Sequence, residues 1–321
     1  MVAAGYTDSV NVAVIIVSWN VRELLAKCLA SVQAEAAAWH DGRVETWVVD
    51  NDSADGSAAM VRERFPDVRV IESGRNAGYG AGCNLALAAL PSDTHAVLLL
   101  NPDATLQPRS LAALATTLTA HPEVAVVGPQ VLGDDGGIQS TRRRFPRLRT
   151  AFLESTILQT YWARNPELRR YYCWDQPDGH DQAVDWLMGA AWLVRASALR
   201  QVGGFDEQFF MYFEETDWAR RAARAGWAFR YQPAATVIHG GGRSSDQVPK
   251  LRHVYFVQSK VRFYRKYFGR LQGELVRRFL MLNYALQIAE DAVKLALRHK
   301  PRMRRERIGL YGAVLREAFG R

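Results

Sequence analysis

The run from Val97 to Leu100 constrains the fold most, because four branched apolar residues in succession are typical of a strand buried on both faces. Pro102 ends the run, since proline cannot donate to a β-ladder and restricts the residue before it. Asp103 therefore stands at the carboxyl end of a buried strand, where open α/β sheets bind ligands. A carboxylate there suits a divalent cation shared with phosphate oxygens. It equally suits a turn that caps the next helix, and this segment alone leaves both interpretations open.

Similar strands recur through the first half of the chain and alternate with helical segments. The expected strands are 12–17, 44–49, 68–71, 97–100 and 124–127, and the expected helices are 21–32, 60–65, 83–90 and 108–120. This alternation predicts an α/β fold with a doubly wound, mainly parallel sheet flanked by helices. We interpret 141–183, which mixes arginines with aromatic residues, as a mobile and partly helical insertion. A helix over 214–225 and a short strand over 235–238 follow.

The sequence from Pro249 onward has a helical pattern throughout. Apolar residues recur every three to four positions between Leu275 and Leu297, which predicts one apolar stripe. Glu290 and Asp291 interrupt this segment and argue against a membrane span. Because six basic residues follow up to Arg307, we expect 271–321 to be a basic amphipathic extension that binds a membrane surface. Packing on the rest of the chain, or an oligomer contact such as that of a homodimer, fits the same pattern.

Charge and cysteine content narrow the function classes. Two clusters, at 142–149 and 298–307, together hold more basic residues than the net charge of +8, so the rest of the chain is close to neutral. Anionic partners are therefore expected near these two clusters. The three cysteines form no CxxC pair, which supports neither a zinc site nor a disulfide framework. The first apolar run is too short for a signal peptide, and we expect a cytoplasmic location, peripheral on the inner face of the cell membrane.

Polar or glycine-rich clusters follow the expected strands. They are Ser18 to Asn20, Asp50, Asn76 to Gly82, Asp103 and His239. Because the carboxyl ends of parallel strands share one edge of a sheet, these clusters are expected to converge on one ligand. Each one also has a purely structural interpretation as a turn, a helix cap or a structural histidine.

In their order and spacing, these clusters resemble the motifs of glycosyltransferase family 2, the inverting sugar-nucleotide transferases with the GT-A fold. The matching segments are VSWN at 17–20, VDNDSADGS at 49–57, NAGYG at 76–80, LNPD at 100–103 and GGFDEQFFMYFEETD at 203–217. The resemblance covers roughly residues 10–270 and is to the rhamnosyltransferase-like branch of bacterial cell-surface polysaccharide synthesis. It implies a glycosyltransferase domain over 1–270, with a nucleotide-binding half over 1–130 and an acceptor half over 131–270.

The resemblance also implies substrates. The first candidate donor is dTDP-L-rhamnose, and a UDP-hexose is the alternative, because the edge of a pyrimidine ring that Asp50 would bind is common to thymine and uracil. The implied acceptor is a glycan or a polyprenyl-diphosphate-linked glycan, which would explain a basic, amphipathic C-terminus.

The resemblance assigns roles to individual residues. Asp50 would bind the pyrimidine, and the other nucleotide-binding residues would be Ser18, Asn20, Asn76, Gly78 and Asn101. Asp103 would bind Mg²⁺ or Mn²⁺, with His239 as a further ligand. Asn101 stands where the family often has a first aspartate, so the site has one charge fewer.

The catalytic base implied by the resemblance is Glu215, one methylene longer than the family's aspartate, with Asp217 as the rival. We expect an acceptor wall nearby, formed by Trp186, Met188, Gly189 and Trp218, with Glu214 as a further acceptor-binding residue. The alternative is that the acidic residues of 214–217 only stabilise the start of a helix.

Three other function classes fit the sequence less well. A dinucleotide oxidoreductase needs a glycine-rich first turn, and Ser18 to Val21 contains no glycine. A sugar nucleotidyltransferase would need a glycine- and lysine-rich N-terminal loop, which is missing. A non-catalytic nucleotide- or nucleic-acid-binding protein would use the arginine clusters and leave the acidic clusters unexplained, so no nucleic-acid partner is expected.

Overall fold

The computed structural model describes residues 9–241 and 247–319, and the chain divides into two compact units. The sheet unit comprises Met1–Arg143, Gln176–Gln208 and Glu214–Ser244. The helical unit comprises Arg144–Asp175, Phe209–Phe213 and Ser245–Arg321. The division differs from the expected boundary at residue 270, because the middle of the chain joins the C-terminal helices.

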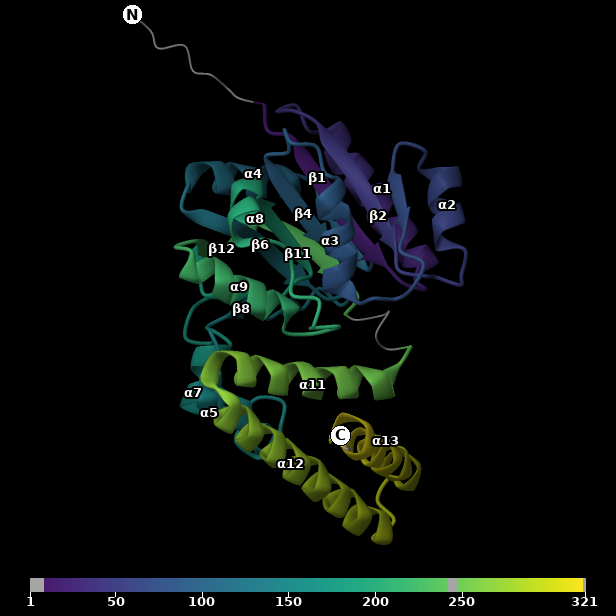
Figure 1. Cartoon of the computed structure of the whole chain (residues 1–321), viewed down its shortest axis with the longest axis vertical. Helices are drawn as coiled ribbons and strands as arrows, with labels where there is room; N and C mark the ends of the chain where they lie inside the picture. Colours follow the sequence, from purple (N-terminus) through teal and green to yellow (C-terminus); the bar gives the residue numbers. More distant parts are fainter. Residues whose placement is uncertain (1–8, 242–246, 320–321) are drawn as a thin grey trace, which may run out of the picture. The chain divides into compact units, whose positions relative to one another are not determined.

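The sheet unit is built on a mixed sheet in the order β3-β2-β1-β4-β11-β6-β12-β5, with β7 beside β6 and β9 beside β12 (Figure 1). Its strands are β1 (Val12–Ser18), β2 (Val44–Asp50), β3 (Arg69–Glu72), β4 (Ala96–Leu100), β5 (Ala104–Leu106), β6 (Val124–Leu132), β7 (Ile138–Gln139), β9 (Gln182–Val184), β11 (Ala191–Arg195) and β12 (Ala228–His239). The strands β8 (Arg142–Arg143) and β10 (Trp186–Leu187) pair separately.

The predicted α/β fold is confirmed, and the first four expected strands are parallel neighbours. The register places Ser18 beside Asp50 at the carboxyl ends of β1 and β2. Two features were not expected. Strand β11 runs antiparallel to both β4 and β6, and the short strand β5 directly follows Asp103 and pairs with the end of β12.

Helices cover both faces of this sheet. They are α1 (Arg22–Ala37), α2 (Ser57–Arg64), α3 (Tyr79–Ala89), α4 (Ser110–Ala120), α8 (Ala196–Val202) and α9 (Glu214–Arg224). Alternate residues of β1, including Val14 and Ile16, belong to one large core with α1, α2 and α4. Helix α1 runs five residues past its expected end. Its last turns bring the buried Glu35 to α4, where the carboxylate accepts the backbone N–H groups of Arg109 and Leu111 at 2.8 Å each.

The helical unit contains α5 (Leu148–Leu153), α6 (Ile157–Tyr161), α7 (Pro166–Tyr171), α11 (Pro249–Phe268), α12 (Arg270–Ala296) and α13 (Pro301–Phe319). Helices α11, α12 and α13 lie side by side (Figure 1). The segment expected as a mobile insertion thus supplies three helices. It is tied to α11 by the buried Lys260, whose ammonium group donates to the carboxylate of Glu154 at 3.0 Å.

An ion cluster explains the acidic residue that interrupts the apolar pattern of α12. Asp291 is buried and pairs with Arg304 at 2.5 Å and with Arg307 at 3.1 Å, both on α13. The cluster fastens the α12–α13 hairpin. Among the described residues, no helix combines the length and apolar character needed to cross a membrane.

Candidate active site

The predicted nucleotide site begins at the paired ends of β1 and β2. Ser18 and Asp50 are both buried, and neither the Ser18 hydroxyl nor the Asp50 Oδ1 has a hydrogen-bond partner among the described residues. Burial raises the pKa of Asp50, while hydrogen bonds from Ser53 oppose the rise. Because buried polar atoms in folded proteins are nearly always paired, two neighbouring orphans indicate a place where a polar ligand binds.

The glycine-rich turn after β3 is held in place by Asn51, which the sequence analysis did not single out. Its side-chain amide donates to Asn76 Oδ1 at 3.0 Å and to the Gly78 carbonyl at 3.2 Å. Gly78 has a φ of 92°, a value that favours glycine, and its N–H donates to the same Asn76 oxygen. The turn thus lies beside Asp50 at the N-terminus of α3.

Asn20 belongs to the same edge, with its polar groups turned toward the loop after β2. Its N–H donates to the Ser53 hydroxyl at 3.0 Å, and its side-chain oxygen accepts the Ala54 N–H at 2.8 Å. The geometry shows a residue that orders the loop after Asp50. A direct contact between Asn20 and the nucleotide stays a prediction.

The predicted metal ligands lie together at the ends of β4 and β12. His239 Nε2 is 3.3 Å from Asp103 Oδ1 and 3.2 Å from Asn101 Nδ2, and both Asp103 and His239 are largely buried. Gln139 fixes the imidazole: its amide nitrogen donates to the His239 carbonyl, so its oxygen is the atom 3.2 Å from His239 Nδ1. Gln139 is a second residue that the sequence analysis missed.

Whether a divalent cation fits between Asp103 and His239 depends on which of their atoms have free lone pairs. A proton on His239 Nδ1, shared with Gln139, leaves the Nε2 lone pair to accept from the Asn101 amide nitrogen at 3.2 Å, with the Asp103 carboxylate 3.3 Å away. A divalent cation held by Asp103 and His239 would take the place of the Asn101 N–H at this lone pair. An imidazole and a carboxylate are ligands that Mn²⁺ accepts, and Mg²⁺ accepts the carboxylate. Among the described residues no cluster of three His, Cys, Asp or Glu side chains forms, so substrate phosphates or water would complete the shell.

The predicted base lies on the first turn of α9. The Glu215 carboxylate accepts the N–H of Gly189, and a Cβ on Gly189 would fall 2.1 Å from Glu215 Oε1. The absence of a side chain at Gly189 therefore makes room for the longer glutamate. Burial raises the pKa of Glu215 to about 7, against the opposing effects of the Gly189 N–H and of Arg143. A pKa in this range suits a general base at physiological pH.

Glu214 forms a buried carboxyl pair with Glu215. Burial, together with the charge of Glu215, raises the pKa of Glu214 well above its ordinary value. Its Oε2 is buried without a hydrogen-bond partner among the described residues. Tyr79 and Cys83 of α3 also interact electrostatically with both carboxyls. Helix α3 therefore begins at the glycine-rich turn with Tyr79 and reaches the carboxyl pair one helical turn later with Cys83.

Asp217, the rival base, has a structural environment. It is fully buried and accepts a hydrogen bond from Arg221 at 3.0 Å. Arg221 also donates to the carbonyls of Val202 and Gly204. The Asp217–Arg221 pair thus fastens the loop that precedes α9, which favours Glu215 as the base.

The predicted acceptor wall is only partly supported. Trp218 is buried in an aromatic cluster with Trp192, Phe205 and Phe229, and its indole N–H donates to the Gly203 carbonyl at 2.8 Å. Trp218 therefore belongs to the core, which corrects the expectation from the sequence. Trp186 is also buried, on β10. Met188 is half-buried and precedes Gly189, so these two residues remain candidates for acceptor contact.

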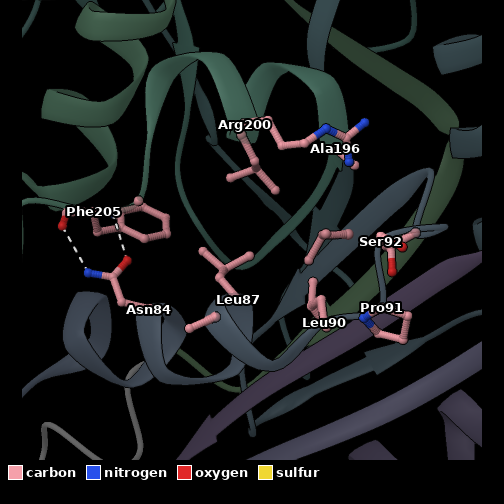
Figure 2. A pocket seen from close by; sticks show the side chains of 13 residues that line it. Asn84, Leu87, Leu90, Pro91, Ser92, Ala196, Arg200 and Phe205 are labelled. Atoms are coloured by element: carbon pink, nitrogen blue, oxygen red, sulfur yellow. Dashed lines mark hydrogen bonds between the residues drawn. The ribbon is translucent and has the colours of Figure 1, made fainter.

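A pocket between α3 and α8 is lined by none of the residues that the sequence predicted for the site. Figure 2 shows Asn84 at one end of it, directed toward the backbone of Phe205. The Asn84 amide donates to the Phe205 carbonyl at 3.0 Å, and its oxygen accepts the Phe205 N–H at 2.8 Å. A side chain at Gly204 would collide with Asn84. Asn84 thus links α3 to the loop that leads into α9, which makes it a positioning residue.

Comparisons with known proteins agree with this geometry. The chain is 34% identical over 215 residues to N-acetylglucosaminyl-diphospho-decaprenol L-rhamnosyltransferase of Mycobacterium tuberculosis, covering 64% of this chain and 69% of the relative. It is 28% identical over 236 residues to rhamnosyltransferase WbbL of Escherichia coli K12, covering 71% and 83% of the two chains.

Solved structures show the same fold. A mannosyltransferase of Pyrobaculum calidifontis, solved with GDP-Man and Mn²⁺, superposes with a TM-score of 0.55 at 16% identity, over 96% of this chain and 85% of that one. The model of the family described as Glycosyl transferase family 2 matches residues 13–193, more than half of the sequence. With its GT-A architecture, its strand-end site and its glycosyltransferase relatives, this chain belongs to glycosyltransferase family 2.

Proposed function

We propose that this chain is an inverting hexosyltransferase of cell-surface polysaccharide synthesis, with dTDP-L-rhamnose as the first candidate donor. The observation that carries the proposal is the buried Glu215 carboxylate, which accepts a hydrogen bond from the Gly189 N–H. It belongs to the same sheet unit as Ser18 and Asp50, the proposed nucleotide-binding residues. The names of the two rhamnosyltransferase relatives support the choice of sugar. A UDP-hexose donor is the alternative.

The nucleotide would bind against Ser18 and Asp50. An ionised Asp50 accepts hydrogen bonds only, so its unpartnered Oδ1 suits the N3–H of a pyrimidine. Thymine and uracil both carry this N–H, which is why the site selects a pyrimidine without selecting between dTDP and UDP. Asn76 and Gly78, held by Asn51, would lie next to the ribose and diphosphate.

Asp103 and His239 would hold Mg²⁺ or Mn²⁺, with Asn101 beside them. When bound, the ion would act as a Lewis acid that neutralises charge on the departing diphosphate. Gln139 supports this role because it keeps the His239 Nε2 lone pair directed toward the ion position.

Glu215 would accept the proton of the acceptor hydroxyl as that oxygen forms its bond to the anomeric carbon. The nucleotide diphosphate leaves from the opposite face, so the configuration inverts. The base has to be ionised when the acceptor binds, and two adjacent buried carboxyls cannot both ionise easily. Burial raises the pKa of both carboxyls, so the pair would carry one negative charge, which the N–H of Gly189 stabilises on Glu215.

A lipid-linked acceptor is part of the proposal, because the mycobacterial relative is named for an N-acetylglucosaminyl-diphospho-decaprenol substrate. The enzyme would then work at the inner face of the cell membrane, as a monomer or homodimer.

Sugar-nucleotide screening tests the function. Purified protein with Mn²⁺ is incubated with dTDP-L-rhamnose, UDP-glucose, UDP-galactose or UDP-N-acetylglucosamine, and release of dTDP or UDP is measured. Thermal shifts with dTDP or UDP plus Mn²⁺, compared with NADH and with an oligonucleotide, separate a transferase from the other classes. We expect stabilisation by a pyrimidine diphosphate, lost in Asp50→Ala. Stabilisation by NADH or the oligonucleotide alone would contradict the proposal.

A further inference from the structure

Helix α12 presents an apolar stripe on the surface of the helical unit. Its large members are between 48% and 79% exposed, and they are Leu271, Leu275, Leu282, Leu286, Val293 and Leu297. The exposed Ala285, Ala289 and Ala296 lie on the same face. With a rise of 1.5 Å per residue, the stripe runs for about 39 Å.

The opposite face of α12 already has its packing partners. Val276, Leu280 and Tyr284 are buried in the core that α12 shares with α11 and α13. These residues are four positions apart and half a helical turn from the exposed stripe, so α12 has two apolar faces. A helix on the surface of a soluble protein normally has only one. The exposed leucines therefore exceed what folding of this unit requires.

Aromatic residues flank the stripe. Tyr161 and Trp162, at the end of α6, are 70% and 59% exposed. Their position beside α12 follows from two contacts: the Tyr161 hydroxyl donates to Glu290 at 3.0 Å, and the Ile157 N–H donates to Asn283 at 2.8 Å. Exposed tyrosine and tryptophan next to leucine is the composition of a surface that lies at a membrane–water interface, where amphipathic rings are favoured.

The charge around the stripe identifies the occupant. From Arg270 to Phe319 the sequence has eleven Lys and Arg against five Asp and Glu. Arg278 lies within the stripe, is 75% exposed and pairs with Glu274. Arg298, Lys300 and Arg302 are exposed just beyond the end of the stripe, where Arg302 pairs with Glu306. A second copy of this surface would bring like charges together. An anionic bilayer complements them, and the long arginine stem can lie among leucines while its head reaches phosphate.

We propose that the α12 stripe, with Tyr161 and Trp162, docks this protein on an anionic phospholipid surface, the helix lying in the interface. Burial of the apolar stripe in the interface would favour binding along the length of α12. Each basic residue at the end of the stripe would add a similar increment to the binding free energy. The proposal rests in part on the proposed lipid-linked acceptor, which would be reached from such a surface.

Vesicle sedimentation tests this docking without any substrate, so its outcome is independent of the proposed transfer activity. The full chain is mixed with vesicles of phosphatidylcholine alone or with 30% phosphatidylglycerol. Three variants are compared: Leu282→Glu with Leu286→Glu, the triple change of Arg298, Lys300 and Arg302 to Gln, and Leu251→Glu. Leu251 is an exposed leucine of α11 outside the stripe and is the matched control.

We expect wild type and Leu251→Glu to sediment with the anionic vesicles and to be released by high salt. The double leucine variant should bind at least about tenfold more weakly. The triple basic variant should bind roughly 150-fold more weakly. Because these side chains are exposed, thermal unfolding should be unchanged. Equal recovery of wild type in the supernatant with both vesicle types would overturn the proposal. So would a wild-type dimer that the leucine variant dissociates while neither protein binds vesicles.

Discussion

The pH dependence of transfer should report the ionisation of Glu215. Burial raises the pKa of this carboxyl to about 7, although the Gly189 N–H and Arg143 both favour the charged form. A general base works only when ionised, so the rate should rise as the pH increases through this pKa. The experiment therefore compares the transfer rate at pH 6 and pH 8, at constant ionic strength and saturating metal.

The size of the effect follows from the fraction ionised. With a pKa of about 7, roughly 9% of Glu215 is ionised at pH 6 and roughly 91% at pH 8, so kcat/KM should rise about tenfold. An ordinary glutamate, with a pKa of about 4.3, would be almost fully ionised at both values and would change the rate by about 2%. The two cases are readily separated.

The assay is steady-state release of nucleotide diphosphate from the donor found by screening, between pH 5.5 and 9. Nucleotide affinity measured by calorimetry over the same range is the control, because Asp50 also has a raised pKa and would alter binding. A flat kcat/KM between pH 6 and 8 would refute the assignment. An unchanged ascending limb in the residual activity of Glu215→Gln would refute it as well.

Four further predictions follow from the geometry. Glu215→Gln should lower kcat by about 10²–10⁴ with nucleotide affinity unchanged, and an equal loss confined to Asp217→Asn would move the base two residues along. Glu215→Gln should also raise the melting temperature at pH 8. Because the pKa of Glu215 is raised by folding, the free energy of unfolding of the wild type falls as the pH rises from about 4.5 to 7, and a neutral glutamine does not suffer this loss. Asp103→Ala should abolish transfer and weaken binding of Mn²⁺ with dTDP by calorimetry, whereas full wild-type activity in EDTA would remove the metal from the reaction. Asp291→Asn should destabilise the chain by about 3 kcal/mol in urea unfolding, because it leaves two arginines of α13 without their buried partner; an unchanged midpoint would show that the cluster is not structural.

The parallel half of the sheet could be predicted because its strands are long, apolar and separated by helices of clear period. Strand β5 could not, since its three residues carry no periodic signal. The first half of β12 was missed because Pro233 and a register shift between Gln232 and Thr236 interrupt the alternation. The helical unit depends on contacts between segments distant in sequence, such as Glu154 and Lys260, which local patterns do not contain.

The candidate site shows the same division. The positions of Asp50, Asp103 and Glu215 could be predicted because the first ends a strand, the second lies shortly after one and the third lies in the first turn of a helix. Gln139 could not, because its role comes from His239, one hundred residues later. The expectation that Trp218 lines the acceptor wall is wrong because its position on α9 turns it into the core, which the local sequence does not show.

The backbone just before the carboxyl pair is strained. Tyr212 and Phe213 both have a φ of 66°, a left-handed conformation that costs bulky residues on the order of 1–3 kcal/mol each. Phe213 packs against Phe256 and Phe263 of α11, and these contacts offset that cost within the helical unit. The next residue in the chain is Glu214, so the strain ends where α9 begins. Phe263→Ala would remove one of these contacts and let the left-handed backbone relax toward an unstrained conformation.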